Sequence, residues 1–328
     1  MNEAERTIVN EIWTQLWERY YQVAGSEGLA RWLLPRPLAE TTRPLAETTQ
    51  PLAETTQPLA ETTRPTSVDV SGASPPSGGE VSALEKRPSL EIVSHCWRYA
   101  HLLNYQLSSL VLHPPRELDV RVTVFYSPDD AATAGVLEFF GRHRIPGIDW
   151  NWWPQPKESL FRRAIGRNLA ARRTTADWIW FTDCDQVFHR GCLDALRPIF
   201  ERCGGPLLFP RMVHCTPRLD DADPMLAGAR DRPGIVDIDP TRFRSVEHHK
   251  AIGALQIVRG DVSRGIGYCD AVPFFQKPVR RWRKCYEDRV FRRLVGTQGE
   301  AIELPGLFRI EHVHKGRKRQ PMVRRRAA

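Results

Sequence analysis

The stretch WIWFTDCDQVF, residues 178–188, joins a run of apolar residues to two aspartates that are one residue apart. Such a run predicts a buried strand, and two close carboxylates at its end repel each other and resist desolvation. A divalent cation offsets that cost, and oxygen ligands favour Mg2+ or Mn2+. Asp183 and Asp185 face the same side if the strand stays extended past Phe181, and they can also converge if the chain turns there. The alternative is that they cap the segment that follows.

The segments on both sides of this stretch alternate between predicted strands and predicted helices. Short runs rich in Val, Ile and aromatic residues are followed by longer segments with apolar residues at helical spacing. This order predicts an α/β fold with a mostly parallel sheet and helices on both faces, where ligands bind at the carboxyl ends of the strands. SHCW, SPDD and TDCD all fall at such ends. The predicted strands are 90–96, 119–126, 147–153, 177–185 and 207–214, and the predicted helices are 100–112, 131–143 and 158–175.

The first 86 residues have a different composition. Residues 1–34 contain an amphipathic pattern that predicts a helical segment. Residues 35–86 contain the unit PLAETT(R/Q) four times. Proline in every unit excludes a continuous helix, and one Leu and one Ala per unit bury little surface, so we expect a disordered linker. A globular domain is expected over residues 87–318, followed by a basic tail at 319–328.

Composition and charge narrow the classes of function. The net charge is +8, and much of the excess lies in KGRKRQPMVRRRAA at the C-terminus. Such a tail is either a solvated, disordered end or a segment that makes peripheral contact with an anionic membrane surface. No nucleic-acid-binding motif is recognisable, so nucleic acid is not expected as a partner. The seven cysteines form no C-x-x-C pair, and we find no signal peptide and no membrane-spanning apolar run. We therefore expect reduced thiols and a cytoplasmic protein.

Between residues 92 and 316 the chain contains five motifs in a fixed order: IVSHCWRYAHLLNYQLSSL, SPDD, RRAIGRNLAARRTTADWIWFTDCD, YEDRVFRRL and RIEHVHKG. Together they resemble the family 2 glycosyltransferases of the GT-A fold. The resemblance spans the domain at 87–318. It implies a metal-dependent, inverting transfer of a sugar from a nucleotide-sugar donor to a hydroxyl of a glycan, a lipid-linked acceptor or a protein. The chain departs from the family pattern at Cys184 and Gln186, and its SPDD loop lacks the usual Gly-Ser-Thr.

The resemblance implies a metal site built on the D-x-D. Asp183 and Asp185 would hold Mn2+ or Mg2+, which neutralises the departing diphosphate, and Asp183 would also touch the ribose. His312 would be the third ligand, as a neutral imidazole. His314 is its rival, because it points the same way on a strand. The alternative is that both histidines are ordinary surface residues.

The resemblance also implies a nucleotide site next to the metal. Asp129 in the SPDD loop would accept a hydrogen bond from the base of a nucleotide sugar, for which a UDP-sugar is expected. Ser94 and His95, at the end of the first strand, would line the same pocket. Arg167 would reach the diphosphate, because its fixed donors suit phosphate oxygens. The alternatives are that Asp130 caps the next helix and that Arg167 is an exposed helix residue.

The acceptor hydroxyl must lose its proton when it attacks the sugar. The motif YEDRVFRRL offers Asp288 as the general base, with Glu287 beside it as the second catalytic carboxylate. Direct attack by the activated hydroxyl inverts the anomeric centre. The alternative is an acidic pair that is favoured at the start of a helix by the helix dipole. Residues 207–283 are expected to form the acceptor side.

The D-x-D stretch also fits a second template. Haloacid-dehalogenase-like phosphatases place D-x-D-x-(V/T) after a hydrophobic strand, and Asp183, Asp185 and Val187 match it. Asp183 would then be a nucleophile and Asp185 a general acid. That family carries the motif on its first strand, whereas three predicted strands come first here. The later acidic pair of that family would be Asp220 and Asp221, which follow a polar loop rather than an apolar strand.

Overall fold

The computed structural model describes residues 87–229, 232–282 and 285–313. The helical segment predicted at 1–34, the linker predicted at 35–86, the basic tail and His314 all lie outside these residues and stay predictions. Within the described part, no helix is both long and apolar enough to cross a bilayer. All seven cysteines lie in this part and are free thiols.

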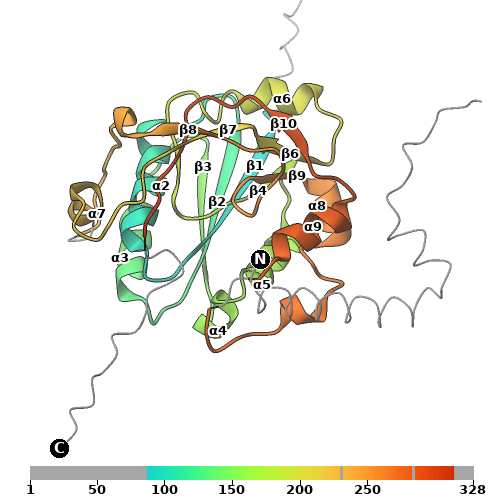
Figure 1. The fold of residues 1–328 in the computed structure, drawn as a ribbon, viewed down its shortest axis with the longest axis horizontal. Coiled ribbons are helices and arrows are strands. Elements are labelled where there is room, and N and C mark those ends of the chain that lie inside the picture. The colour runs from blue at the N-terminus through green and yellow to red at the C-terminus, as the bar shows by residue number, and fades with distance from the viewer. Residues whose placement is uncertain (1–86, 230–231, 283–284, 314–328) are drawn as a thin grey trace, which may run out of the picture. The chain divides into compact units, whose positions relative to one another are not determined.

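A seven-stranded sheet forms the centre of the domain, in the order β10-β6-β9-β4-β1-β2-β3 (Figure 1). Neighbouring strands are parallel except where β9 is involved, since it runs antiparallel to both β4 and β6. The predicted α/β class with a mostly parallel sheet is confirmed. The strands are β1 (Ser89–Cys96), β2 (Asp119–Tyr126), β3 (Ile148–Pro154), β4 (Trp178–Phe181), β6 (Leu207–Pro210), β9 (Gln256–Arg259) and β10 (Glu300–Ile302).

The carboxyl ends of the first four strands lie at one edge of this sheet. Cys96 at the end of β1 pairs with Tyr126 at the end of β2, which pairs with Pro154 at the end of β3. On the other side of β1, Phe181 at the end of β4 pairs with Val93. The segments that follow these strands include SPDD and TDCD, so the register brings both motifs to the same edge. We call it the donor edge.

A second sheet of four strands, in the order β5-β11-β7-β8, lies beside the first. The single strand predicted at 207–214 is wrong, because the chain crosses between the sheets at Arg211. β6 is buried along its whole length between β10 and β9, whereas β7 alternates between buried and half-buried residues. Two short strands in different environments therefore replace one apolar run. The strands are β5 (Gln186–Phe188), β7 (Met212–Cys215), β8 (Arg244–Glu247) and β11 (Leu307–Arg309).

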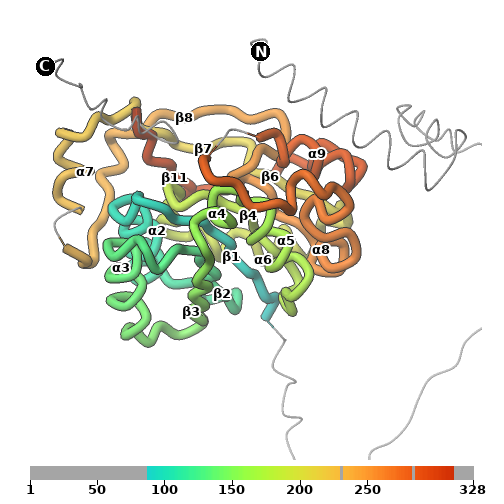
Figure 2. Tube along the Cα trace, turned by 90° about the horizontal axis from the view of Figure 1, so that it is seen from below, coloured from blue at the N-terminus to red at the C-terminus, as the bar shows by residue number. Residues whose placement is uncertain are grey.

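Helices flank the central sheet on both sides: α2 packs with α3 on one side, and α8 packs with α5 and α9 on the other (Figures 1 and 2). The helix predicted at 158–175 is broken at Arg162, which leaves the helical conformation with ψ of 82°. Its guanidinium lies 4.5 Å from the ring centre of Phe274. The helices are α2 (Ala100–Leu112), α3 (Ala131–Gly141), α4 (Lys157–Leu160), α5 (Arg163–Arg173), α6 (Leu196–Arg202), α7 (Pro224–Gly228), α8 (Gly260–Ile266) and α9 (Glu287–Val295), with single 3-10 turns at Pro240–Arg242 and Pro273–Gln276.

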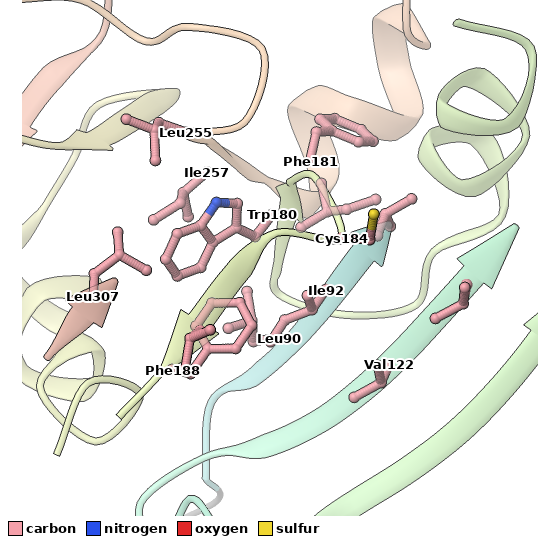
Figure 3. Close-up of a cluster of buried hydrophobic side chains, with 14 of the residues drawn as sticks. Leu90, Ile92, Val122, Trp180, Phe181, Cys184, Phe188, Leu255, Ile257 and Leu307 are labelled. Carbon is pink, nitrogen blue, oxygen red and sulfur yellow. The ribbon is translucent and has the colours of Figure 1, made fainter. Parts of the chain in front are cut away.

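The core lies between the two sheets and around β4. Figure 3 shows Trp180 at its centre, among side chains from β1, β5, β9 and β11. The indole of Trp180 is fully buried, and its Nε1 donates to the backbone oxygen of Ala254 at 3.1 Å. Phe188 meets it edge-on, with ring centres 5.2 Å apart. Truncation of so large a buried ring to alanine costs about 3–5 kcal/mol, so β4 is anchored firmly behind the D-x-D.

Candidate active site at the donor edge

The D-x-D forms a turn rather than a continuation of β4. The backbone N–H of Thr182 still donates to Val93 at 3.0 Å, but that of Gln186 donates back to the oxygen of Asp183 at 3.2 Å. The extended geometry considered for this segment is therefore absent, and the turn is the observed arrangement. The side chain of Asp183 stays partly exposed, whereas Asp185 is buried.

Helix α2 holds this turn through one amide. The Nε2 of Gln106 donates to the backbone oxygen of Asp183 at 2.9 Å. The Oε1 of the same amide accepts from the hydroxyl of Ser94 at 2.6 Å. Ser94 is fully buried, so it contacts the turn through Gln106 and has no exposed surface toward a ligand. No sequence motif indicates Gln106, because the spacing of a predicted helix does not show which partner a polar side chain on it will contact.

Two arginines of α5 hold the carboxylate of Asp183. Arg163 forms an ion pair with it, and the Nη2 of Arg167 lies 3.5 Å from its Oδ1. The two arginines are four residues apart and so share one helix face. Arg167 is fully buried and also donates to the oxygen of Gly253 at 2.7 Å and to the hydroxyl of Tyr268 at 2.8 Å. It is therefore not an exposed helix residue, which corrects that alternative.

Arg163 connects the D-x-D to the start of α9. Its Nε lies 3.6 Å from the carboxylate of Glu287, which is buried and also accepts a hydrogen bond from the thiol of Cys285. Chiefly the negative charge of Asp183, and to a lesser degree that of Glu287, raises the pKa of Arg163 above its usual value. Arg163 therefore stays charged at any relevant pH.

The two acidic residues of α9 have different surroundings. Glu287 is 3% exposed, whereas Asp288 is 24% exposed, and the carboxylate of Asp288 lies 3.3 Å from Arg292 one turn later. Both residues lie in the first turn of α9, as the helix-dipole alternative also requires. The greater exposure of Asp288 leaves it as the carboxylate that a substrate can approach.

The segment that contains His312 lies against the D-x-D turn. β11 ends at Arg309, and the N–H of the next residue, Ile310, donates to the backbone oxygen of Asp185 at 3.0 Å. His312 lies beyond the strand in an isolated bridge with Leu219, so the late strand that was expected to carry both histidines is shorter than predicted. The Nε2 of His312 lies 2.9 Å from the carboxylate of Asp221.

The predicted metal ligands do not converge on one point. Among the described residues, Asp183, Asp185 and His312 are not part of any group of three ligand atoms within 4.8 Å of one another. Asp183 is turned toward the arginines, and His312 is close to Asp221. A cation at this edge therefore requires these side chains to exchange partners.

His95 lies at the end of β1 under α5. Its ring stacks on Phe125 with centres 4.9 Å apart, and a Cβ added at Gly166 would lie 2.3 Å from its Nε2. Neither ring nitrogen has a hydrogen-bond partner within the described ranges. Burial, followed by the nearby Arg167 and Arg163, lowers the pKa of His95 well below its usual value, so the imidazole is neutral.

The SPDD loop borders a pocket of about 450 Å3 at the ends of β2 and β3. Asp129 lines it and is 65% exposed, with Lys157 3.8 Å from its carboxylate. Asp130 is different, since its carboxylate accepts hydrogen bonds from the backbone and the hydroxyl of Thr133 and caps α3. The capping role considered for Asp130 is confirmed, and Asp129 is the residue of the pair that faces the pocket.

Tyr268 and Arg163 are two residues of the site that the motifs do not single out. The hydroxyl of Tyr268 accepts from Arg167 and donates to Gln256 at 2.9 Å, which links α5 to β9 behind the site. Arg163 had a signal, because it precedes Arg167 by one helical turn in the same motif. Tyr268 had none, because it lies in an irregular stretch far from the D-x-D in the sequence.

No protein-family model matches this sequence, and no curated protein matches it. Several solved structures match the structure of this chain. The mannosyltransferase PcManGT from Pyrobaculum calidifontis, in complex with GDP-Man and Mn2+, is 15% identical with a TM-score of 0.42, over 70% of this chain and 58% of that chain. Residues 1–349 of TarS from S. aureus, in complex with UDP-GlcNAc, are 10% identical with a TM-score of 0.43, over 68% and 59%. The chain thus spans about three fifths of the structures it matches.

The donor edge combines fixed positive charge, carboxylates and an open pocket. The half-buried Arg163 suits a ligand with phosphate oxygens, because guanidinium donors match them in pairs. The half-buried carboxylate of Asp288 can accept a proton. The pocket beside Asp129 has room for a planar group with hydrogen-bond donors. This arrangement can bind a nucleoside diphosphate and deprotonate a second substrate.

Proposed function

We propose that the protein is an inverting glycosyltransferase that transfers a sugar from a nucleotide-sugar donor to a hydroxyl acceptor. The observation that carries the proposal is the network in which Arg163 contacts both Asp183 of the D-x-D and Glu287 beside Asp288. It supports the proposal because it brings Arg163, the D-x-D and the start of α9 together at one edge of a mostly parallel sheet, where such folds bind ligands.

We propose that the reaction depends on Mn2+ or Mg2+. Two carboxylates and an imidazole are a suitable donor set for either ion, and the bond from Ile310 to Asp185 keeps the segment of His312 beside the D-x-D. Asp183, Asp185 and His312 would hold the ion, with His314 as the alternative to His312. When bound, the ion supplies positive charge that neutralises the departing diphosphate.

Arg163 of α5 would bind the diphosphate of the donor. Arg163 and Arg167 now pair with Asp183, and phosphate oxygens would offer the half-buried Arg163 a stronger partner with more negative charge. Arg167, which was expected to reach the diphosphate, has no exposed surface and would act through Asp183. If Arg163 moves onto the diphosphate, Asp183 is released toward the ribose and the ion. Asp129 would accept a hydrogen bond from the base inside the pocket, for which a uridine nucleotide is the expected ligand.

Asp288 would act as the general base. It accepts the proton of the acceptor hydroxyl while the oxygen attacks the anomeric carbon from the face opposite the diphosphate, which inverts that centre. Glu287 is buried and paired with Arg163, so it positions the start of α9 rather than contacting the acceptor. Arg292 lies 3.3 Å from the carboxylate of Asp288 and would hold it in position before the reaction.

The phosphatase alternative is not favoured by the site. Its nucleophile would be Asp183, whose carboxylate is held by two arginines. Its late acidic pair would include Asp221, which instead contacts His312. The D-x-D also follows the fourth strand along the chain rather than the first.

Calorimetry with a panel of nucleotides tests the proposal. UDP, GDP, CMP and their common sugar forms are titrated with and without Mn2+, and the ligand that binds is repeated with Asp185→Ala. The control is Asp149→Ala, an exposed aspartate on β3 away from the donor edge. We expect Mn2+-dependent binding of one nucleoside diphosphate, lost in Asp185→Ala and kept in the control. Absence of binding by every nucleotide refutes the proposal.

A further inference from the structure

A second cluster of metal-binding side chains lies away from the donor edge, at the C-terminal end of α2. His113 follows α2, His189 follows β5, and Asp237 lies in the loop before β8. One ligand atom from each lies within 4.8 Å of the other two, and no other described group of three or more His, Cys, Asp or Glu side chains meets this criterion. We call these residues the histidine cluster.

The two imidazoles of the cluster lie in contact with each other. The Nε2 of His113 is buried and has no hydrogen-bond partner among the described residues. The rings meet edge-on with centres 4.2 Å apart. A buried ring nitrogen without a partner is costly, and a metal ion satisfies it.

Asp237 supplies the negative charge of the cluster and its connection to solvent. Its Oδ1 accepts from the N–H of Ile238 at 2.8 Å, which fixes the carboxylate beside the histidines. Its side chain is exposed, so an ion can enter from solvent and keep a water molecule as a further ligand. Arg190 follows His189 in the chain, and its positive charge opposes binding of a cation.

We propose that His113, His189 and Asp237 bind one Zn2+ ion. Two imidazoles, one carboxylate and a water are a common tetrahedral ligand set for zinc. The ligand atoms now lie within 4.8 Å of one another. In a tetrahedral zinc site they are about 3.4 Å apart, because each bond is near 2.1 Å long. Rotamer changes that move the side chains together by little more than about 1 Å are therefore enough. The nearby thiol of Cys192 is fully buried and outside the group, so the site has nitrogen and oxygen ligands only.

The ion would connect three segments that already touch. The N–H of Phe188 donates to the hydroxyl of Ser109 at 3.0 Å, and that of Val236 donates to the hydroxyl of Ser108 at 3.0 Å. Gln106, which holds the D-x-D turn, lies seven residues before His113, or about 10 Å along α2. Zinc at His113 therefore stabilises the C-terminal end of α2, the helix whose Gln106 holds the D-x-D turn. The proposal stands whether or not the protein transfers sugars.

Zinc binding by the full chain tests the proposal directly. The reduced protein is freed of metal with a chelator, dialysed against buffered ZnCl2 and analysed for bound zinc, and its melting temperature is measured with and without Zn2+. The ligand variants are His113→Gln, His189→Gln and Asp237→Asn. The control is His214→Gln, a half-buried histidine that contacts the same Phe308 as His189 but lies outside the cluster. Co2+ serves as a spectroscopic probe of the ligands.

We expect one equivalent of zinc and a melting temperature raised by roughly 5–10 °C at free Zn2+ about 100-fold above Kd. Each ligand variant should weaken binding about tenfold or more, and His214→Gln and Asp185→Asn should bind as the wild type does. Because Asp237 is exposed, its variant stays informative if a histidine variant fails to fold. The proposal is overturned if no stoichiometric zinc binds, if the ligand variants bind like the control, or if Co2+ shows the charge-transfer band of a thiolate.

Discussion

The donor edge and the histidine cluster are two candidate metal sites with opposite properties. At the donor edge, the D-x-D is visible in the sequence, but Asp183 is paired with arginines and the three expected ligands are apart. In the histidine cluster, no two ligands are near each other in the sequence, but their atoms lie close together. Short spacing in a motif therefore does not ensure convergence of ligands, because opposite charges nearby compete for the carboxylates.

The largest expected effect is on catalysis, and it should appear at the donor edge without changing the histidine cluster. Asp185→Asn should lower release of nucleoside diphosphate from the donor by roughly 10⁴-fold with Mn2+ present, because the ion loses a carboxylate ligand. Zinc binding and the melting temperature should stay near wild type. The measurement is nucleotide release beside zinc analysis, with Asp149→Asn as the control. A variant with normal activity would show that the D-x-D has no catalytic role.

The next effect tests the base on α9. Asp288→Asn should reduce kcat by about 10²–10³-fold while Mn2+-dependent nucleotide binding is kept, since only the proton acceptor is lost. Asp261→Asn is a matched control, because Asp261 also lies in the first turn of a helix. Steady-state kinetics and calorimetry are compared. Loss of nucleotide binding in Asp288→Asn would instead assign this residue to the donor.

The variant Arg163→Met tests whether Arg163 binds the sugar donor or only pairs with Asp183. Arg163→Met should raise KM for the donor by about 10–100-fold and lower kcat less, because a charge-assisted phosphate contact is worth about 1.5–3 kcal/mol. Arg172→Met, on the same helix but paired with Asp270, is the control. If Arg163→Met binds the donor more tightly, the arginine competes with the ion for Asp183 and does not bind phosphate.

A smaller effect concerns the pH dependence of stability. Burial lowers the pKa of His95, so below pH 6.5 the unfolded chain takes up a proton that the folded chain does not. Stability contributed by His95 is complete above pH 6.5 and decreases as the pH falls, by up to about 1.4 kcal/mol per pH unit. Urea unfolding between pH 7.5 and 5.5 should show a shallower dependence for His95→Gln than for the exposed His249→Gln. Equal slopes would contradict a neutral, buried His95.

The smallest effect on either site is expected from the basic tail. Deletion of residues 315–328 should weaken binding to anionic vesicles, because it removes clustered Lys and Arg. Nucleotide and zinc binding should not change. Co-sedimentation with vesicles of anionic and neutral lipid measures the difference. Unchanged binding to anionic vesicles would remove the membrane interpretation of the tail.

Much of the fold could be predicted from local patterns. The helix at 100–112 and the strand at 119–126 have the predicted bounds, because their apolar spacing continues from end to end. The segment 207–214 is mostly apolar and predicts one strand, yet its two halves belong to different sheets. Whether apolar side chains face one layer or two depends on neighbours that are distant in the sequence.

The candidate site could be predicted only in part, because motifs indicate residues but not the partners of those residues. Asp183, Asp185 and Asp288 carry motif signals. The register of the sheet brings the D-x-D to the donor edge, and the contact of Arg163 with Glu287 brings the start of α9 there. Ser94 was expected to line the pocket, but it is buried and acts through Gln106. Such a role depends on which side chain stands opposite, and spacing along the chain contains no information about that.

The sequence by itself determined the α/β class, the order of the elements and the motifs at the ends of the strands, because these follow from periodicity and composition within short windows. Only the tertiary structure decided that the D-x-D is a turn held by Gln106 and paired with Arg163. It alone also brought His113, His189 and Asp237 together. Ion pairs and metal sites require atoms within a few ångströms, and the packing of distant segments sets those distances.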